Sequence, residues 1–219
     1  NMKRYLEIEH NAAAHHLSIL GAFHPNAGDG VAADDKTLLL LGPGDPGFWA
    51  HVTTCPEFED GNPNPLDRWS ERVIGRLARD FGGRALFPFG GPPWHPFIAW
   101  AQRSGRAWVS PVSLLVHDTA GLMVSYRGAI ALPEKISLPP TCTSKPCVDC
   151  TRPCLAACPV NALTETGYDT AACHAWLDTA AGQACMTQGC AVRRACPISQ
   201  TYGRHPAQSA FHMRHFHPA

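Results

Sequence analysis

Eight of the ten cysteines in this chain lie between residues 147 and 196, and their spacing could bind metal. The segment begins with the run CxxCxxxCxxxCP and continues with four more widely spaced cysteines, the last again followed by proline. A tight run of this kind can place three thiolates around one iron–sulfur cluster while the fourth reaches a second cluster. Two clusters need eight thiolates, so the segment predicts two [4Fe–4S] clusters.

The expected ligand sets exchange their fourth members, as in bacterial two-cluster sequences. The first set comprises Cys147, Cys150, Cys154 and Cys196. The second set comprises Cys158, Cys173, Cys185 and Cys190. Three residues rather than two separate Cys150 from Cys154, so the partition is less firmly indicated than the number of clusters. Cys142 is the natural substitute ligand, and Cys55 has no assigned role.

Zinc and disulfides are the alternatives to iron and sulfide. Two zinc sites would also need about eight soft ligands, but zinc favours paired CxxC motifs separated by a longer loop. A disulfide scaffold is typical of small secreted chains, and this chain is neither small nor visibly secreted. Iron–sulfur ligation is therefore favoured over both.

Composition restricts the partners that we expect. Lys plus Arg and Asp plus Glu each number 18 among 219 residues, so the formal net charge is zero with histidines neutral. This balance disfavours a nucleic-acid partner. We find no apolar run long enough to span a membrane, and we therefore expect a soluble, cytoplasmic protein with no membrane contact.

Local patterns upstream predict a mixture of helices and strands. Residues 2–20 suit a helix, and residues 36–41 suit a buried strand that ends in the tight turn GPGDPG. The clearest helix lies within residues 62–83, between prolines and a Gly-Gly pair. Its predicted apolar face comprises Trp69, Val73, Leu77 and Phe81.

These elements must position the cysteines through two domains. A second helix is expected within residues 95–105, and two β segments within residues 107–132, joined at residues 118–121. We expect an α/β or α+β domain over residues 1–135, and an iron–sulfur domain with a C-terminal tail over residues 136–219. The fold class of the whole chain is then α+β.

The cysteine segment resembles a known family. "CVDCTRPCLAACPVNAL", the lone cysteine of "DTAACHAWL" and "CMTQGCAVRRACP" are similar to the C-terminal two-cluster module of epoxyqueuosine reductase and, more distantly, of reductive dehalogenases. The resemblance covers residues 142–200. It implies a ferredoxin-like 2[4Fe–4S] domain that passes electrons to cobalamin on a nitroreductase-like N-terminal domain, here shortened.

The chain departs from this family at two catalytic positions. Where the family carries an aspartate before a helix, this chain has Pro92 or its neighbours, and where it carries a lysine it has Pro111. Neither proline side chain can transfer a proton. Epoxyqueuosine reductase activity is therefore not supported residue by residue.

Several other polar residues are weaker candidates. His95, in "FPFGGPPWHPF", could be a catalytic acid or an axial ligand, although a structural histidine is the commoner case. Arg193 and Arg194 could tune a neighbouring cluster or form a solvated pair. The tail histidines could bind metal, although a tail packed over the cluster module is favoured: His205, His212, His215 and His217.

Three functions follow from these observations. The first is an iron–sulfur oxidoreductase component that passes single electrons to a site on the N-terminal domain, with a corrinoid or another small molecule as acceptor. The second is an electron carrier or docking module without its own substrate site. The third is a tRNA-modifying reductase. Each would need a protein that donates or accepts electrons.

Overall fold

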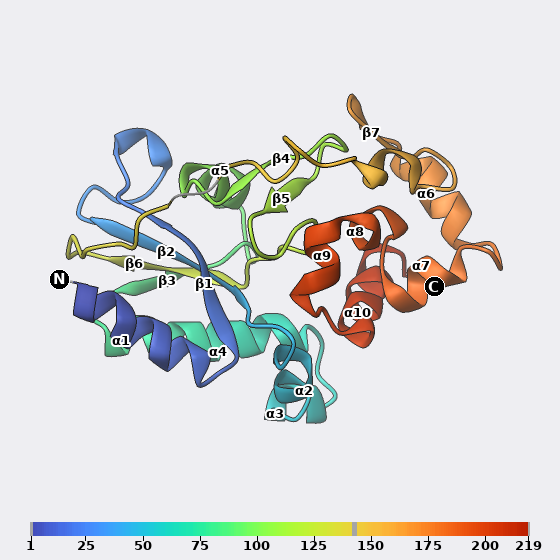
Figure 1. The fold of residues 1–219 in the computed structure, drawn as a ribbon. Coiled ribbons are helices and arrows are strands. Elements are labelled where there is room, and N and C mark those ends of the chain that lie inside the picture. Colours follow the sequence, from blue (N-terminus) through green and yellow to red (C-terminus); the bar gives the residue numbers. More distant parts are fainter. Residues whose placement is uncertain (1, 142–143, 219) are drawn as a thin grey trace. The chain divides into compact units, whose positions relative to one another are not determined.

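The computed structural model describes residues 2–141 and 144–218, which form two compact units (Figure 1). Unit 1 contains residues 2–106 and 125–141, and unit 2 contains residues 107–124 and 144–218. The sequence suggested a boundary at residue 135, whereas residues 107–124 belong to the cysteine-rich unit. Val112 and Val116 explain the difference, because both are buried against cysteine-segment residues such as Val192.

Unit 1 is built on a four-stranded sheet with the order β1-β2-β6-β3. All three neighbouring pairs are antiparallel, so unit 1 is α+β and the α/β alternative is wrong. The central β2 carries Leu38 to Leu41, four leucines with no exposed surface, and Leu39 lies opposite Ile130. The strands are β1 (Leu17–Phe23), β2 (Thr37–Pro43), β3 (Arg84–Leu86) and β6 (Gly128–Leu132).

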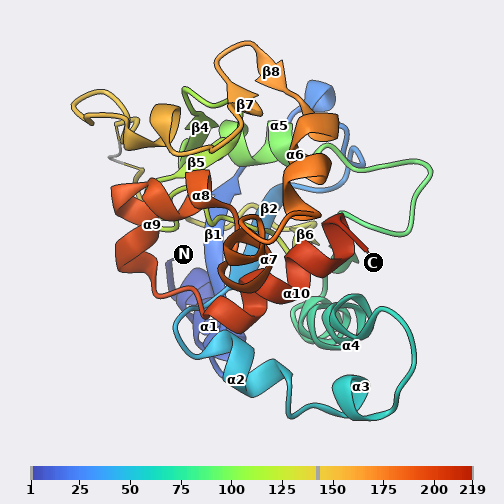
Figure 2. The same ribbon diagram turned by 90° about the vertical axis from the view of Figure 1, so that its right-hand side faces the viewer.

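Helices α1 (Met2–Ala13) and α4 (Pro65–Asp80) lie together on one side of this sheet, and α5 (Phe97–Arg103) lies on the other (Figure 1 and Figure 2). Helix α4 has the predicted face, because Trp69, Val73 and Leu77 are buried, while Phe81 follows its end. The predicted helix over residues 2–20 was too long. His16 has a φ of 54°, which ends the helical path before β1.

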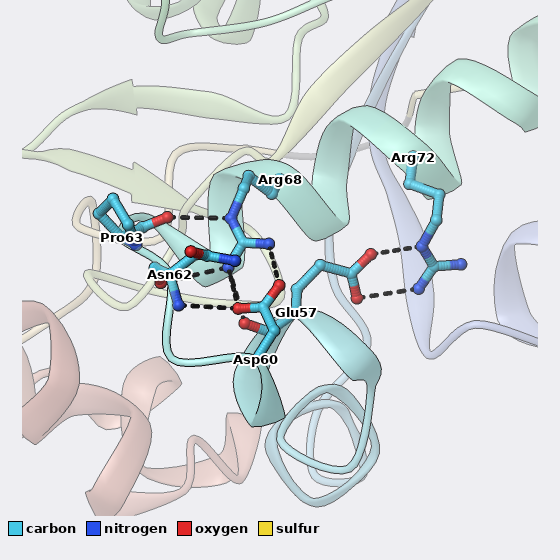
Figure 3. A network of polar contacts seen from close by, with 6 residues as sticks. All are labelled: Glu57, Asp60, Asn62, Pro63, Arg68 and Arg72. Atoms are coloured by element: carbon cyan, nitrogen blue, oxygen red, sulfur yellow. Dashed lines mark hydrogen bonds and ion pairs between the residues drawn. The ribbon is translucent and has the colours of Figure 1, made fainter.

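After α2 (Phe48–Val52), a polar network links α3 (Pro56–Glu59) and the residues that follow it to α4 (Figure 3). Arg68 donates two hydrogen bonds to the Asp60 carboxylate, at 2.7 and 2.8 Å, and Arg72 pairs with Glu57. These hydrogen bonds lower the pKa of both carboxyl groups, that of Asp60 to about 2. We therefore interpret the network as structural, because it holds α3 and the residues after it against α4. The remaining helical turn of unit 1 is η1 (Ala27–Asp29).

Unit 2 begins with a hairpin of β4 (Ala107–Val109) and β5 (Leu115–His117). We expected the join between two β segments at residues 118–121, but β4 and β5 are joined through residues 110–114. The turn at 118–121 instead follows β5. Buried His117 stabilises it, because its Nδ1 accepts from the backbone N–H groups of Thr119 and Ala120, each at 3.1 Å.

The rest of unit 2 consists of short elements around the cysteines. A second small hairpin pairs Leu163 with Tyr168, and α10 packs against α7 (Figure 2). The elements are η2 (Pro153–Ala156), β7 (Leu163–Thr164), β8 (Gly167–Tyr168), α6 (Thr170–Leu177), α7 (Gln183–Gln188), α8 (Ala191–Ala195), α9 (Pro197–Tyr202) and α10 (Pro206–Phe216). In the described part of the chain, no helix has the length and apolar character needed to cross a bilayer.

Candidate metal centre

A small apolar core in unit 2 supports the cysteine loops. Its members come from both sequence segments of the unit and include two cysteines: Val112, Val116, Leu122, Cys154, Leu163, Val192 and Cys196. Three further cysteines, Cys147, Cys158 and Cys190, are partly buried against this core. Apolar packing therefore brings together thiols that are far apart in the sequence.

The first set is assembled where α8 packs against η2. Cys154 lies in η2, and Cys196 lies where α8 gives way to α9, directly before the first helical residue Pro197. Burial raises the pKa of the Cys154 thiol, and repulsion from Cys147, Cys196 and Cys150 raises it further. The four thiols of the first set are therefore close enough to act on one another electrostatically.

The second set is distributed over three helical elements. Cys173 lies in α6, Cys185 is buried in α7, and Cys190 immediately precedes α8. Burial is the main cause that raises the pKa of the Cys173 thiol, and repulsion from Cys190, Cys158 and Cys185 adds to it. The two groups have the same members as the ligand sets expected from the sequence, while metal binding itself stays a prediction.

Backbone N–H groups point at sulfur in both sets. The N–H of Arg152 donates to Cys150 Sγ at 3.3 Å, and the N–H of Ala162 donates to Cys158 Sγ at 3.2 Å. Such donors stabilise negative charge on sulfur and are one of the means by which proteins tune iron–sulfur clusters. The local backbone is thus suited to thiolates.

The thiols are neither cross-linked nor grouped for a single ion. Each of the nine cysteines in the described residues is free of disulfides, and Cys142 lies outside those residues. Within residues 2–141 and 144–218, no three His, Cys, Asp or Glu side chains are placed to hold one metal ion. A tetrahedral zinc site needs thiolates about 3.8 Å apart, whereas a cluster of several iron atoms spans a wider gap. The two sets could hold such clusters.

Comparisons with protein-family models, curated proteins and solved structures find no match to this chain. Interpretation of the site therefore depends on its own residues.

Two of the other candidates from the sequence, His95 and Cys55, belong to unit 1. His95 is in unit 1, where its half-buried ring stacks on Trp100 with the ring centroids 5.6 Å apart. Trp100 in turn donates to the Asp29 carbonyl at 2.6 Å, so its ring is held in place. Cys55 is also in unit 1, directly before α3, and its thiol donates to the His51 carbonyl at 3.6 Å. These contacts support structural roles for both residues.

The tail histidines make contacts within unit 2. His205 caps α10 by accepting a hydrogen bond from the Ala207 N–H at 3.1 Å. His217 lies 2.7 Å from His174, Nδ1 to Nδ1, and its Nε2 lies 2.9 Å from Asp178 Oδ1. The tail thus contacts α6, one residue beyond Cys173. Its other two histidines lie in α10: His212 and His215.

Arg193 and Arg194 are not a solvated pair. Arg193 donates to the Leu122 carbonyl and Arg194 donates to the Gly189 carbonyl at 2.9 Å. Burial lowers the pKa of Arg193, whose guanidinium also lies near Cys190. Arg193 therefore connects the 107–124 segment with the second set.

One residue of the site escaped the sequence analysis. The Tyr168 hydroxyl donates to Cys173 Sγ at 3.3 Å. A tyrosine five residues before a cysteine has no recognisable pattern, because the contact depends on the β7–β8 hairpin that turns it toward α6.

An open groove of about 940 Å³ also lies in unit 2, between α7 and α10, with Leu177, Met186 and Ala210 among its apolar lining.

Proposed function

We propose that unit 2 is an electron-transfer module that binds two [4Fe–4S] clusters, one on each set of four cysteines. The observation that carries this proposal is the apolar core of unit 2, which contains or contacts five of the eight thiols, from both sets. The N–H groups directed at Cys150 and Cys158 support it further, because they favour thiolates. When bound, such clusters accept and release single electrons.

In this proposal the residues of the chain bind the clusters, limit their exposure to water and set their reduction potentials, and no residue reacts chemically. A donor protein loses one electron in each step and an acceptor gains it, so no bond forms and no proton has to move. Burial of Cys154, Cys185 and Cys196 keeps water from part of each site. Solvent exposure and hydrogen bonds to sulfur set the potential at which transfer occurs.

The first set lies under an exposed loop that suits a protein donor. Val148 and Leu155 are 65% and 39% exposed, so this loop presents apolar side chains to solvent. Burial is the main cause that raises the pKa of Cys147, and the cations Lys145 and Arg152 oppose it, so both lie nearby. An apolar surface flanked by cations fits an acidic one-electron carrier of the ferredoxin or flavodoxin class.

The acceptor is the weaker part of the proposal. The resemblance implies a corrinoid on unit 1, but several of the large aromatic side chains that could line a flat pocket there fill the core instead, while Trp94 is 66% exposed. Trp69, Trp100 and Phe48 are among the fully buried residues of the core. These residues do not support a corrinoid acceptor, and an electron carrier without its own substrate site is the second candidate function.

Metal analysis of the anaerobically purified chain tests the proposal. We expect about eight iron and eight sulfide per chain, with paired EPR signals after dithionite reduction. Cys55→Ser is the matched control and should keep all the iron, whereas Cys147→Ser should lose iron from the first set. Zinc without sulfide would overturn the proposal. A cob(II)alamin EPR signal that shifts on adding the protein would favour a corrinoid acceptor, and an unchanged signal would favour the carrier.

A further inference from the structure

The two cysteine sets have different polar surroundings. Beside the second set, the Tyr168 hydroxyl donates to Cys173 Sγ at 3.3 Å. The ring of Tyr168 stacks on Phe216, and Phe216 stacks on His174, at centroid distances of 6.1 and 4.6 Å. These contacts from α10 and α6 hold the hydroxyl toward sulfur.

The phenol stays a hydrogen-bond donor at neutral pH. A tyrosine hydroxyl ordinarily ionises only at about pH 10. The hydroxyl proton is therefore retained across the physiological range. A proton directed at thiolate sulfur stabilises added negative charge there.

A sheltered cation adds to this effect. Arg193 lies near Cys190 and Tyr168 and donates to the Leu122 carbonyl, while Arg204 donates to the neighbouring Met123 carbonyl at 2.6 Å. Both arginines are thus tied to the 107–124 segment of the same unit.

Of the two cations beside the first set, Arg152 faces more solvent than the part-buried Arg193. Arg152 is exposed and Lys145 is half-buried, in a loop whose neighbouring residues are mostly exposed. Water and salt screen an exposed charge much more than a buried one. The charge of Arg193 beside the second set is therefore screened less than that of Arg152 beside the first.

We propose that Tyr168 is a positioning residue whose hydroxyl, together with Arg193, makes the cluster on Cys158, Cys173, Cys185 and Cys190 the more readily reduced of the two. This inference rests on the proposed function. A donor proton and a sheltered positive charge both favour the reduced, more negative state, so both raise the reduction potential. With both clusters bound, an electron delivered beside the exposed loop of the first set would therefore be held by the second set.

A redox titration of the anaerobically purified protein, followed by EPR, tests this inference. Tyr168→Phe keeps the ring and removes the hydroxyl, so the higher of the two midpoint potentials should fall while the lower one stays unchanged. We expect a shift of about tenfold in the equilibrium constant, equal to 59 mV for a one-electron couple. Tyr5→Phe, in α1 of unit 1, is the matched control and should change neither potential.

A second variant covers the case in which Tyr168→Phe loses iron. Arg193→Gln removes the charge and keeps a donor for the Leu122 carbonyl, and it should lower the same potential. Full iron content with both potentials unchanged in these variants would overturn the inference and leave the proposed function standing. A shift confined to the lower potential would also overturn it. Wild-type protein without iron and sulfide would remove the proposed function itself.

Discussion

Substitution of Gly121 by alanine should destabilise unit 2 at the join between its two sequence segments. Gly121 has a φ of 58°, and a Cβ atom there would lie 2.5 Å from the backbone nitrogen of Ser199. The left-handed conformation costs a non-glycine residue about 1–2 kcal/mol. An extra methyl group in a packed site costs about 1–3 kcal/mol. We therefore expect the free energy of unfolding to fall by about 2–5 kcal/mol.

The Gly121→Ala substitution should also disturb the first set, because the displaced helix α9 begins directly after Cys196. Ser199 is buried, its hydroxyl accepts from the Leu122 N–H at 2.9 Å, and it lies three residues after Cys196. Displacing Ser199 should therefore move Cys196 away from the other members of the first set. Iron bound there should be lost first when the purified variant is exposed to a chelator.

Urea unfolding followed by circular dichroism, with iron analysis on the same samples, measures both effects. Gly82→Ala is the matched control, because Gly82 also has a positive φ, of 72°, but a Cβ atom there meets nothing within 4 Å. The control should show the conformational cost alone. If Gly121→Ala is no less stable than Gly82→Ala and keeps its iron under chelation, the packing argument is refuted.

Three further outcomes are expected. Cys158→Ser should lower the iron content from about eight to about four per chain, measured by colorimetric iron and sulfide assays, because only the second set loses a ligand. Asp67→Asn should cost unit 1 about 3 kcal/mol in urea unfolding, because Arg127 is buried and donates to Asp67 and would lose its charged partner. The stability difference between wild type and Glu57→Gln should be present at neutral pH and shrink below about pH 4.5, because the hydrogen bond from Arg72 lowers the Glu57 pKa and this contribution is lost as that carboxylate is protonated.

Strong local patterns were sufficient to predict parts of unit 1. The apolar face of α4 could be derived from Trp69, Val73 and Leu77, because each is buried at helical spacing. The leucine run of β2 predicted a strand buried on both faces. The end of α1 could not be derived, because it depends on the left-handed backbone at His16 and on pairing between β1 and β2.

For the candidate site, the cysteine spacing predicts two ligand sets, and metal binding by them stays a prediction. The thiols that act on Cys154 electrostatically are the other members of the first set, and three of those that act on Cys173 are the other members of the second set. The sequence did not indicate that residues 107–124 belong to the same unit, because Val112 and Leu122 form no periodic pattern with the cysteine segment. It also gave no sign of Tyr168, whose contact depends on tertiary structure.

The dependence of the cysteine loops on the 107–124 segment has a physical reason. Helices α7, α8 and α9 contain only six, five and six residues. Isolated helices shorter than about 12–15 residues are marginal in water, so these must be held by packing or by bound metal. Val192 in α8 is fully buried in the core that Val112 and Val116 complete. Apolar packing from outside the cysteine segment thus helps to position the thiols, and metal binding would contribute folding free energy to the same unit.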